Sequence, residues 1–450
     1  MNKMFAVPRG TSDILPDAVP LWEAIESKAR KICKSYGYRE IRTPIFEDTS
    51  LFKRSLGQTS DVVHKQLFEL ASGTSISFGE ALSGGNKDIV SGYALRPEGT
   101  AAVVRSYLEN SFDGREGLSK FFYLGPMFRG ERPQKGRLRQ FHQIGAEVIG
   151  PNSTSPFLDA EVIALAMHLL SEMGVAKPFL RINSLGSTED KANISAWLRG
   201  EFAKHKTELC DDCQVRFERN VFRVLDCKKE GCRKVVALIV KNLPLSPESQ
   251  QYFDKVQTAL KSIGIAFEVS PHLVRGLDYY THTVFEITAE GLGSQDAIGA
   301  GGRYNGLVHE LGGNEKMDYG AIGFALGIER ILLAQGTSAP VASGINAFVI
   351  AMKEDYQPQA FLLLQQLRDA DISADMTFAG GSMKSQMGKA NKANAKFTLI
   401  LGEDEVKNNT LTVKDMQVGQ QETVDIKNIV NNLKSRVIAR SEATKQSFKE

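Results

Sequence analysis

Arginines and carboxylates recur on two neighbouring segments that are expected to be strands. Arg129 and Glu131 follow the apolar run FFYLGPMF and stand two residues apart, so strand alternation places both side chains on one face. Arg137, Gln143 and Glu147 come next, and the last two stand four residues apart, again on one face. Because a guanidinium donates bidentately to phosphate and keeps its proton, such a sheet face can hold a polyphosphate and a zwitterion together.

The plain alternative is an internal network of arginine–glutamate ion pairs that only holds the sheet and its helices together. The sequence contains no G-x-x-x-x-G-K-[ST] loop, and no G-x-G-x-x-G opens a helix after a first strand. The GAGGR run at residues 299–303 is rich in glycine, which is a weak signal by itself. A bound nucleotide would therefore be held by arginines on strands, which excludes most P-loop and Rossmann enzymes.

The composition is that of a folded, nearly neutral protein. The chain has 450 residues, with 55 Lys and Arg against 53 Asp and Glu, and 42% of its residues are hydrophobic. These values exclude global disorder and a histone-like protein, and the length suggests about three domains. No run of about 18 apolar residues predicts a membrane span, so no membrane partner is expected. The N-terminus lacks an apolar signal core and the five cysteines fit a reducing compartment, so we expect a cytoplasmic protein.

Periodicity predicts the elements that must position these residues. One helical face recurs from Trp22 to Tyr36, and a second recurs within residues 156–173. Residues 120–131 and 139–150 are typical of an antiparallel hairpin with a charged tip, and strands are also expected at 273–288, at 297–307 and from 319 into a helix. Pro44 lacks the N–H that a central strand needs, so its segment suits a sheet edge or an interface.

The chain also divides by composition. Residues 187–262 have a pattern of broken helices and contain four of the five cysteines. A linker is expected at 336–344, and strands and helices alternate over 345–435, which predicts a small α/β module. Residues 436–450 form a polar tail that is expected to fray.

Five motifs resemble those of a known enzyme family. RPEGTA at 96–101, MFRGERPQKGRLRQFHQ at 127–143 and AIGFALGIER at 321–330 resemble the motifs of class II aminoacyl-tRNA synthetases. LVRGLDYY at 273–280 and AGGRYNGL at 300–307 resemble the two signatures of the histidyl-tRNA synthetase family. The resemblance runs from PRGTSDILP near the N-terminus to about Leu433.

The resemblance implies an α+β fold. A class II antiparallel sheet of six or seven strands would form the catalytic core, from residues 1–186 and 263–335. A helical insertion at 187–262 would interrupt it, and the α/β module at 345–435 would bind the anticodon. The helix after Pro20 and the segment around Pro44 resemble the class II dimer motif, so a homodimer is expected.

The family resemblance also implies an ATP site. Arg129 and Arg275 would grip the α-phosphate from two sides and neutralise the charge that develops at phosphorus, which makes them the catalytic pair. Arg137 and Arg330 would hold the γ-phosphate end. Glu131 would lie near the adenine and the magnesium ion that accompanies ATP.

Histidine recognition is implied for a second set of residues. Glu98 and Thr100, with Gly99 between them, would receive the α-ammonium group, and Gln143 would receive the carboxylate. Glu147 and Tyr280 would bind the imidazole beside Tyr279, with Arg129 and Arg275 close by. Ordinary core packing is the alternative for the two tyrosines. Asp278 and His142 are interpreted as structural residues.

Two groups of residues are expected to meet tRNA. Arg132, Gln134 and Lys135 occupy the charged hairpin tip, which resembles the loop that meets the acceptor end. Lys384, Lys389 and Lys392, followed by Lys396, form a basic stretch that would face anticodon-stem phosphates. A solvated surface is the alternative for both groups.

The clustered cysteines leave a metal site open. Cys210, Cys213, Cys227 and Cys232 are spaced C-x2-C, thirteen residues, C-x4-C, and four thiolates at such spacing can close a zinc tetrahedron. The family's insertion often carries cysteines here without an implied catalytic metal. Zinc is therefore not favoured from the sequence, and no metal ligand is assigned.

These features together predict an enzyme that joins L-histidine to tRNA(His) with ATP, through a histidyl-adenylate. A histidine-sensing regulatory paralogue from histidine biosynthesis is one alternative. Another class II synthetase-like tRNA-binding protein is a second. The glycine- and serine-rich stretch at residues 71–92 is longer than the family pattern leads us to expect and receives no role.

Overall fold

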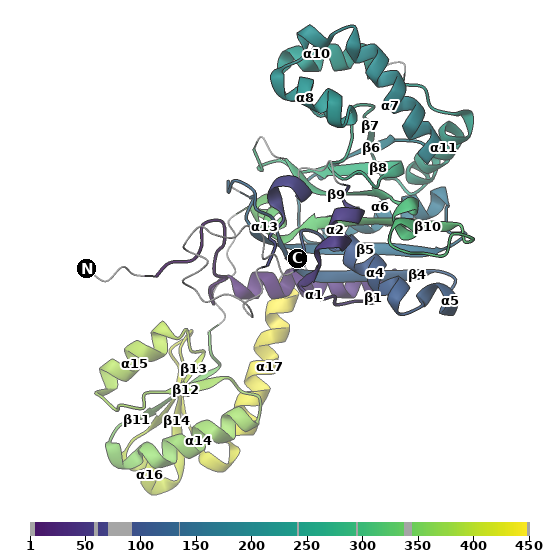
Figure 1. Cartoon of the computed structure of the whole chain (residues 1–450). Coiled ribbons are helices and arrows are strands. Elements are labelled where there is room, and N and C mark those ends of the chain that lie inside the picture. Colours follow the sequence, from purple (N-terminus) through teal and green to yellow (C-terminus); the bar gives the residue numbers. More distant parts are fainter. Residues whose placement is uncertain are drawn as a thin grey trace. The chain divides into compact units, whose positions relative to one another are not determined.

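The computed structural model describes residues 5–57, 62–70, 92–134, 136–240, 243–293, 296–336 and 344–447. They belong to two compact units, an N-terminal unit within Met1–Ser338 and a C-terminal unit within Ala339–Glu450 (Figure 1). Lys135 and residues 71–91 of the glycine- and serine-rich stretch lie outside the described residues. Among the described helices, none is both long enough and apolar enough to cross a bilayer.

An eight-stranded sheet forms the centre of the N-terminal unit, in the order β1-β4-β5-β10-β9-β8-β6-β7. Its strands are β1 (Arg39–Glu40), β4 (Ser119–Phe128), β5 (Gln140–Pro151), β6 (Phe179–Ser184), β7 (Glu268–Val269), β8 (Thr281–Thr288), β9 (Ala297–Arg303) and β10 (Tyr319–Gly327). The inner strands pair antiparallel, which confirms the predicted core. The two-residue edge strands pair parallel and carry too little pattern to be predicted, so the sheet exceeds the expected six or seven strands.

Helices cover both faces of this sheet. On one face lie α1 (Val19–Ser35), α6 (Pro156–Glu172), α11 (Pro247–Ser262) and α13 (Ile328–Gln335). Val162 and Leu169 of α6 pack there against Ile144 and Ile322 of the strands, so the helical periodicity of residues 156–173 is confirmed. On the opposite face lie α2 (Thr49–Ser55), α4 (Thr100–Glu109), α5 (Phe112–Arg115) and α12 (Asn305–Glu310).

The helices of the predicted insertion pack in two different places. Its first part contains α7 (Thr188–Ala203), the 3-10 turn Lys206–Glu208, α8 (Asp211–Arg219), α9 (Phe222–Leu225) and α10 (Glu230–Ile239). Figure 1 shows α7, α8 and α10 gathered beyond the β6–β7 end of the sheet. By contrast, α11 packs on α6 through Phe253, Val256 and Leu260, in the same core as the sheet. The segment 187–262 therefore includes one helix that packs with the core.

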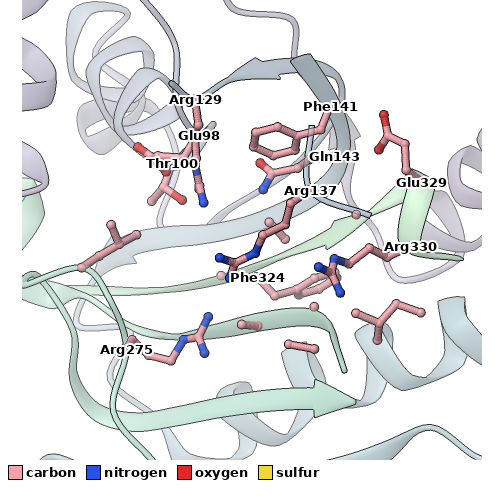
Figure 2. A pocket seen from close by; sticks show the side chains of 18 of the residues that line it. Glu98, Thr100, Arg129, Arg137, Phe141, Gln143, Arg275, Phe324, Glu329 and Arg330 are labelled. Carbon is pink, nitrogen blue, oxygen red and sulfur yellow. Dashed lines mark hydrogen bonds between the residues drawn. The ribbon is translucent and has the colours of Figure 1, made fainter. Parts of the chain in front are cut away.

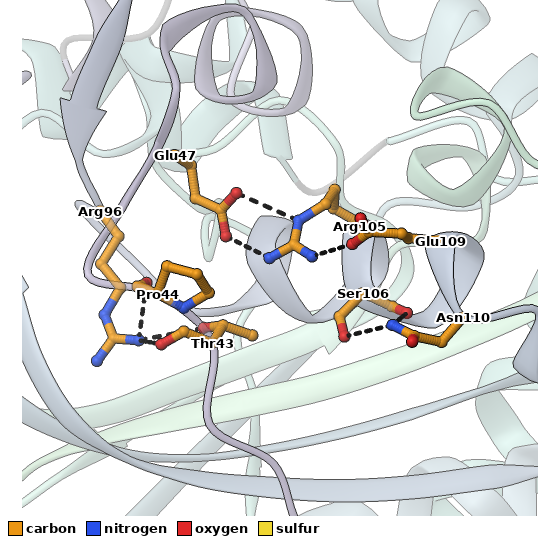
Figure 3. Close-up of polar contacts among 8 residues, drawn as sticks. All are labelled: Thr43, Pro44, Glu47, Arg96, Arg105, Ser106, Glu109 and Asn110. Carbon is orange, nitrogen blue, oxygen red and sulfur yellow. Dashed lines mark hydrogen bonds and ion pairs between the residues drawn. The ribbon is translucent and has the colours of Figure 1, made fainter.

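A small sheet of β2 (Phe46–Asp48) and β3 (Tyr93–Leu95) leads into the RPEGTA motif, and Val62–Gln66 forms a short π-helical turn nearby in sequence. Arg96 is buried, and its guanidinium donates to the backbone carbonyl of Pro126 at 2.9 Å. It also donates to the backbone carbonyl of Thr43 at 3.0 Å (Figure 3). The carbonyl of Pro44 also accepts from Arg96, at 3.3 Å. The first arginine of the motif therefore has an internal structural role.

Two predictions about local structure are wrong. Residues 273–280 form a loop, and the strand expected from 273 begins only at Thr281. Arg129 and Glu131 follow the end of β4, so strand alternation does not explain their placement. At 273–280 apolar residues mimic a strand, whereas at 129–131 the strand β4 ends before the predicted residues. The sheet pairing that defines a strand depends on partners distant in sequence.

The C-terminal unit is the expected α/β module, built on a sheet in the order β12-β11-β13-β14-β15. Its strands are β11 (Ala347–Ala351), β12 (Ala374–Met376), β13 (Phe397–Leu401), β14 (Thr410–Asp415) and β15 (Gln421–Asp425). Its helices are α14 (Gln357–Asp369), α15 (Met383–Lys392), α16 (Glu403–Asn408) and α17 (Ile429–Ser447), with 3-10 turns at Glu354–Tyr356 and Ile426–Asn428. Because α17 continues through Ser447, the tail expected to fray from residue 436 is mostly helical.

Candidate active site

A cavity of about 220 Å³ opens among the β4–β5 connection, the loop before β8, and strands β9 and β10 (Figure 2). The residues predicted from the sequence to bind ATP or histidine that line this cavity are Glu98, Thr100, Arg129, Glu131, Arg137, Gln143, Arg275, Tyr279, Tyr280 and Arg330. They come from segments up to some two hundred residues apart in the chain, and the fold brings them together.

Arg129 and Arg275 lie on opposite sides of this cavity (Figure 2). The Nε of Arg129 donates to the carbonyl of Pro97 at 2.9 Å, and its guanidinium lies 5.2 Å from the ring centroid of Phe141. The Nη1 of Arg275 donates to Glu286 on β8 at 2.7 Å. The Nε of Arg275 is buried and has no hydrogen-bond partner within the described part of the chain. Each arginine is thus fixed at one end and keeps donors for an anion.

Arg137 and Arg330 lie beside each other at another part of the same cavity (Figure 2). Burial, and then the positive charge of Arg137, lower the pKa of Arg330. Glu131 accepts from Arg137 at 3.2 Å and lies 4.0 Å from Arg129, so one carboxylate serves two guanidinium groups. Repulsion between neighbouring cations is relieved by a bound anion, which makes this end of the cavity suited to a polyphosphate.

The acidic end of the site is a buried hydrogen-bond network. Glu98 accepts from the backbone N–H groups of Thr100 at 2.7 Å and Ala101 at 2.9 Å, at the start of α4. The hydroxyl of Thr100 donates to Glu147 Oε1 at 2.7 Å, and the hydroxyl of Tyr304 donates to Glu147 Oε2. Burial raises the pKa of Glu147 to about 8 and also raises the pKa of Glu98. Glu147 is fully buried and is reached from the cavity through Thr100, which does line it.

Gln143 and the two tyrosines complete the cavity wall. The Oε1 of Gln143 is buried and has no hydrogen-bond partner among the described residues, so it is available to a donor on a ligand. The rings of Tyr279 and Tyr280 are 4.6 Å apart between centroids, and both residues are buried. Both also line the cavity, so core packing alone does not describe them.

Comparisons with known proteins identify the family of this chain. A family model described as histidyl-tRNA synthetase matches residues 90–331, and an anticodon-binding domain model matches residues 346–436. A histidine–tRNA ligase from Geobacillus sp. (strain WCH70) is 46% identical over 442 residues, covering 96% of this chain and 99% of the relative. The chain belongs to the histidyl-tRNA synthetase family. A second ligase of the same name, from Desulforamulus reducens, is 43% identical and covers 95% of this chain and 99% of the relative.

Solved structures of this synthetase family have the same architecture. The apo histidyl-tRNA synthetase of S. aureus has a TM-score of 0.75 and 35% identity, and the alignment covers 96% of this chain and all of that one. The histidyl-tRNA synthetase of Nostoc sp. PCC 7120 has a TM-score of 0.64 at 21% identity over 96% of this chain and all of that one, which supports the fold alone.

Several site residues were missed by sequence reasoning. The cavity is also lined by Tyr123, Phe141, Phe324 and Glu329. Tyr304 donates a hydrogen bond to Glu147. Glycines in the sequence could have indicated Tyr123, because Gly145 pairs with it across β4 and β5 and Gly99 lies against its ring. A Cβ atom on Gly145 would lie 2.0 Å from the Tyr123 ring, and one on Gly99 would lie 2.2 Å from it. Gly99 thus makes room for a tyrosine and is not among the cavity-lining residues of this family member.

The residues interpreted as structural have internal partners. Asp278 accepts from the side-chain amide of Asn220 at 2.7 Å. The Nδ1 of His142 lies 2.9 Å from Glu329, and the His142 ring meets Trp22 edge-on at 4.8 Å. Arg303, the arginine of the AGGRYNGL signature, is fully buried in an ion pair with Asp159. Arg303 thus has the purely structural role that an internal arginine–carboxylate network predicts, although it lies in a signature motif of this synthetase family.

Five of the residues predicted to contact tRNA lie at exposed positions in the part of the chain that the structure describes. Arg132 and Gln134 are exposed at the hairpin tip, where the backbone N–H of Arg137 donates to the carbonyl of Gln134 at 2.8 Å. On α15, the exposed lysines are Lys384, Lys389 and Lys392. Lys396 differs, because it follows the helix and donates to Asn346 at 2.9 Å.

Proposed function

We propose that this chain joins L-histidine to tRNA(His) in two steps, with ATP as the energy source and histidyl-adenylate as the intermediate. The relatives that cover nearly the whole chain are histidine–tRNA ligases. The observation that carries the mechanism is the pair Arg129 and Arg275 on opposite sides of one cavity, next to a buried acidic network.

In the first step, the histidine carboxylate attacks the α-phosphorus of ATP and pyrophosphate leaves. Arg129 and Arg275 are assigned to the phosphate oxygens, where negative charge grows in the transition state. Their anchors at Pro97 and Glu286 hold the donors in place before the substrate arrives, which lowers the cost of reorganisation. Arg137 and Arg330 are assigned to the γ-phosphate end. The magnesium ion is part of the nucleotide substrate, and we assign Glu131 to the adenine and magnesium side.

Histidine is assigned to the acidic end of the cavity. Glu98 and Thr100 are assigned to the α-ammonium group, and the side-chain NH2 of Gln143, which donates hydrogen bonds, is assigned to the carboxylate. Tyr280, with Glu147 behind Thr100, is assigned to the imidazole beside Tyr279. An imidazole offers partners on both ring nitrogens, and an apolar amino acid would leave these buried polar groups without partners, so it would be rejected.

In the second step, the histidyl group passes to the terminal adenosine of the tRNA. Arg132 and Gln134 at the hairpin tip, together with Lys135, are assigned to the acceptor end. Lys384, Lys389 and Lys392 are assigned to phosphates near the anticodon, since exposed lysines on one short helix attract a nucleic acid backbone. A homodimer in the cytoplasm belongs to the same proposal.

Histidine-dependent ATP–pyrophosphate exchange tests the first step directly. Arg275→Ala is expected to lower the exchange rate by about 10² to 10³-fold with little effect on ATP affinity, because the lost donors act mainly in the transition state. Arg115→Ala is the matched control, since this arginine of α5 is exposed outside the cavity. Exchange at the wild-type rate in Arg275→Ala would remove Arg275 from the mechanism.

The same assay separates the alternatives. A histidine-sensing regulatory protein would bind histidine without exchange, and a tRNA-binding protein would show neither activity. A solved Bacillus halodurans chain named as a regulatory subunit of ATP phosphoribosyltransferase/histidyl-tRNA synthetase has a TM-score of 0.62, but at 19% identity it supports the fold alone. The four cavity arginines and the anticodon-binding module favour the ligase.

A further inference from the structure

Four cysteine side chains converge at one point of the helical insertion. Cys210 precedes α8, Cys213 lies within α8, Cys227 lies between α9 and α10, and Cys232 lies within α10. Their sulfur atoms all lie within 4.8 Å of one another. All four are free thiols, and three of them are buried.

We propose that these four cysteines bind a zinc ion in a tetrahedral thiolate site that fixes the helical insertion. A zinc–sulfur bond of about 2.3 Å sets the distance between sulfur atoms at about 3.8 Å in a regular tetrahedron. The Sγ atoms of Cys210 and Cys227 already lie 3.9 Å apart. The remaining separations need to close by no more than about 1 Å, a shift that side-chain rotation supplies. The sequence spacing allows a zinc tetrahedron, whereas the family resemblance does not favour one. The convergence of the four sulfur atoms is the observation that favours zinc.

Backbone amide groups and helix N-termini lie beside the cysteine cluster. The backbone N–H of Cys210 donates to Cys232 Sγ at 3.2 Å. Cys210 stands at the N-terminus of α8, and Cys232 is the third residue of α10, so the positive ends of two helix dipoles face the cluster. Lys229 lies within the same short loop as Cys227, where it pairs with Asp212 at 3.4 Å. Amide donors and helix ends of this kind stabilise the charge of bound thiolates.

Simple apolar packing is the competing explanation, because a free cysteine behaves as a small hydrophobic residue. Cys33 fits that explanation, since it is a single buried thiol among the apolar residues of α1. The insertion differs, because thiols from three separate segments meet at one point. Packing alone gives no reason for four such residues to share one position.

The site would also support the active site indirectly. Asn220, which follows α8, donates to Asp278 in the loop that carries Arg275 and Tyr280. A Cβ atom on Gly276 of that loop would lie 2.8 Å from the guanidinium of Arg223 in α9. A metal that fixes α8 and α9 therefore acts as a positioning element for the signature loop, with no direct part in the chemistry.

Metal analysis of the purified full-length chain tests the proposal. The wild type and Cys33→Ser are expected to retain about one zinc ion per chain, whereas Cys213→Ser and Cys232→Ser retain less than about a tenth of that. Cys33→Ser is the matched control because it removes a buried thiol elsewhere. If the serine variants fail to fold, cobalt(II) added to chelator-treated wild type replaces them, and a tetrahedral thiolate site then gives intense visible absorption with sulfur-to-cobalt charge transfer.

Three results would overturn the proposal. The first is wild-type protein that contains no zinc after growth with added zinc and shows no thiolate spectrum with cobalt. The second is zinc that stays bound in Cys213→Ser and Cys232→Ser at the wild-type level. The third is disulfide bonds among the four cysteines in protein purified without reductant from the cytoplasm, found by mass spectrometry.

Discussion

Replacing Glu147 with glutamine is expected to remove a pH dependence from the stability of the N-terminal unit. Glu147 is fully buried beneath the cavity, where burial raises its pKa from the ordinary 4.5 to about 8. The folded protein therefore keeps a proton on this carboxyl group at pH values where the unfolded chain has lost it. Glutamine has nearly the same shape and is neutral at every pH, so Glu147→Gln isolates that proton.

The sign and size follow from proton linkage. The stabilisation from the bound proton is complete below the unfolded pKa, and it is lost as pH rises toward about 8. The slope is about 1.4 kcal/mol for each pH unit in the middle of this range. Between pH 6 and pH 8, the wild type should therefore lose about 2 kcal/mol of unfolding free energy relative to Glu147→Gln.

Urea unfolding followed by tryptophan fluorescence measures this difference. The chain has two tryptophans, Trp22 and Trp197, and both lie in the N-terminal unit, so the signal reports on that unit. Glu172→Gln, at an exposed position of α6, is the control and should follow the wild type at both pH values. Identical pH dependence in wild type and Glu147→Gln would refute the raised pKa and, with it, the view that burial dominates the charge state of this carboxyl group.

Other parts of the molecule give equally direct expectations. Gly323→Ala should lower the rate of histidine-dependent exchange by about 100-fold, because the added Cβ would lie 1.7 Å from Glu147 Oε2. Gly200→Ala is the control and should exchange at the wild-type rate, because its added Cβ would meet no atom within 4 Å. Equal exchange rates in the two variants would contradict the close packing of Gly323 against Glu147. Asp159→Asn should destabilise the N-terminal unit by about 3 to 5 kcal/mol in the same urea assay, because it leaves the Arg303 charge buried without its partner; a change below about 1 kcal/mol would count against that pair. Changing Lys384, Lys389 and Lys392 together to glutamate should raise the KM for tRNA and flatten its salt dependence while exchange stays at the wild-type rate, and an unchanged KM would place the tRNA elsewhere.

Short-range patterns predicted much of the fold. The helices α1 and α6, the β4–β5 hairpin and the passage from β10 into α13 all follow from apolar spacing along one segment. Such spacing determines which face of an element is buried, so it can be read locally. The signature loop at 273–280 was misread as a strand, since Leu273 and Val274 are buried by tertiary packing and not by strand pairing.

The sequence predicts which kinds of side chain bind the substrates, but the role of each residue depends on its partners in the fold. Arginine chemistry and the motifs pointed to Arg129 and Arg275, and both line one cavity. Residue type by itself does not separate them from Arg96, which donates to internal carbonyls, or from Arg303, which pairs with Asp159. The hydrogen-bond partner of each guanidinium comes from a segment distant in the chain, so the spacing of neighbouring residues does not predict it.

Residue chemistry was thus determined by the sequence itself: guanidinium groups able to meet phosphate, carboxylates able to meet an amino acid, and an α/β module after a linker. Only the tertiary structure decided that Glu147 is buried beneath the cavity with a raised pKa, and that four thiols from three separate segments meet at one point. The physical reason is that burial and convergence are properties of three-dimensional packing. Both depend on which distant segments exclude water around a group.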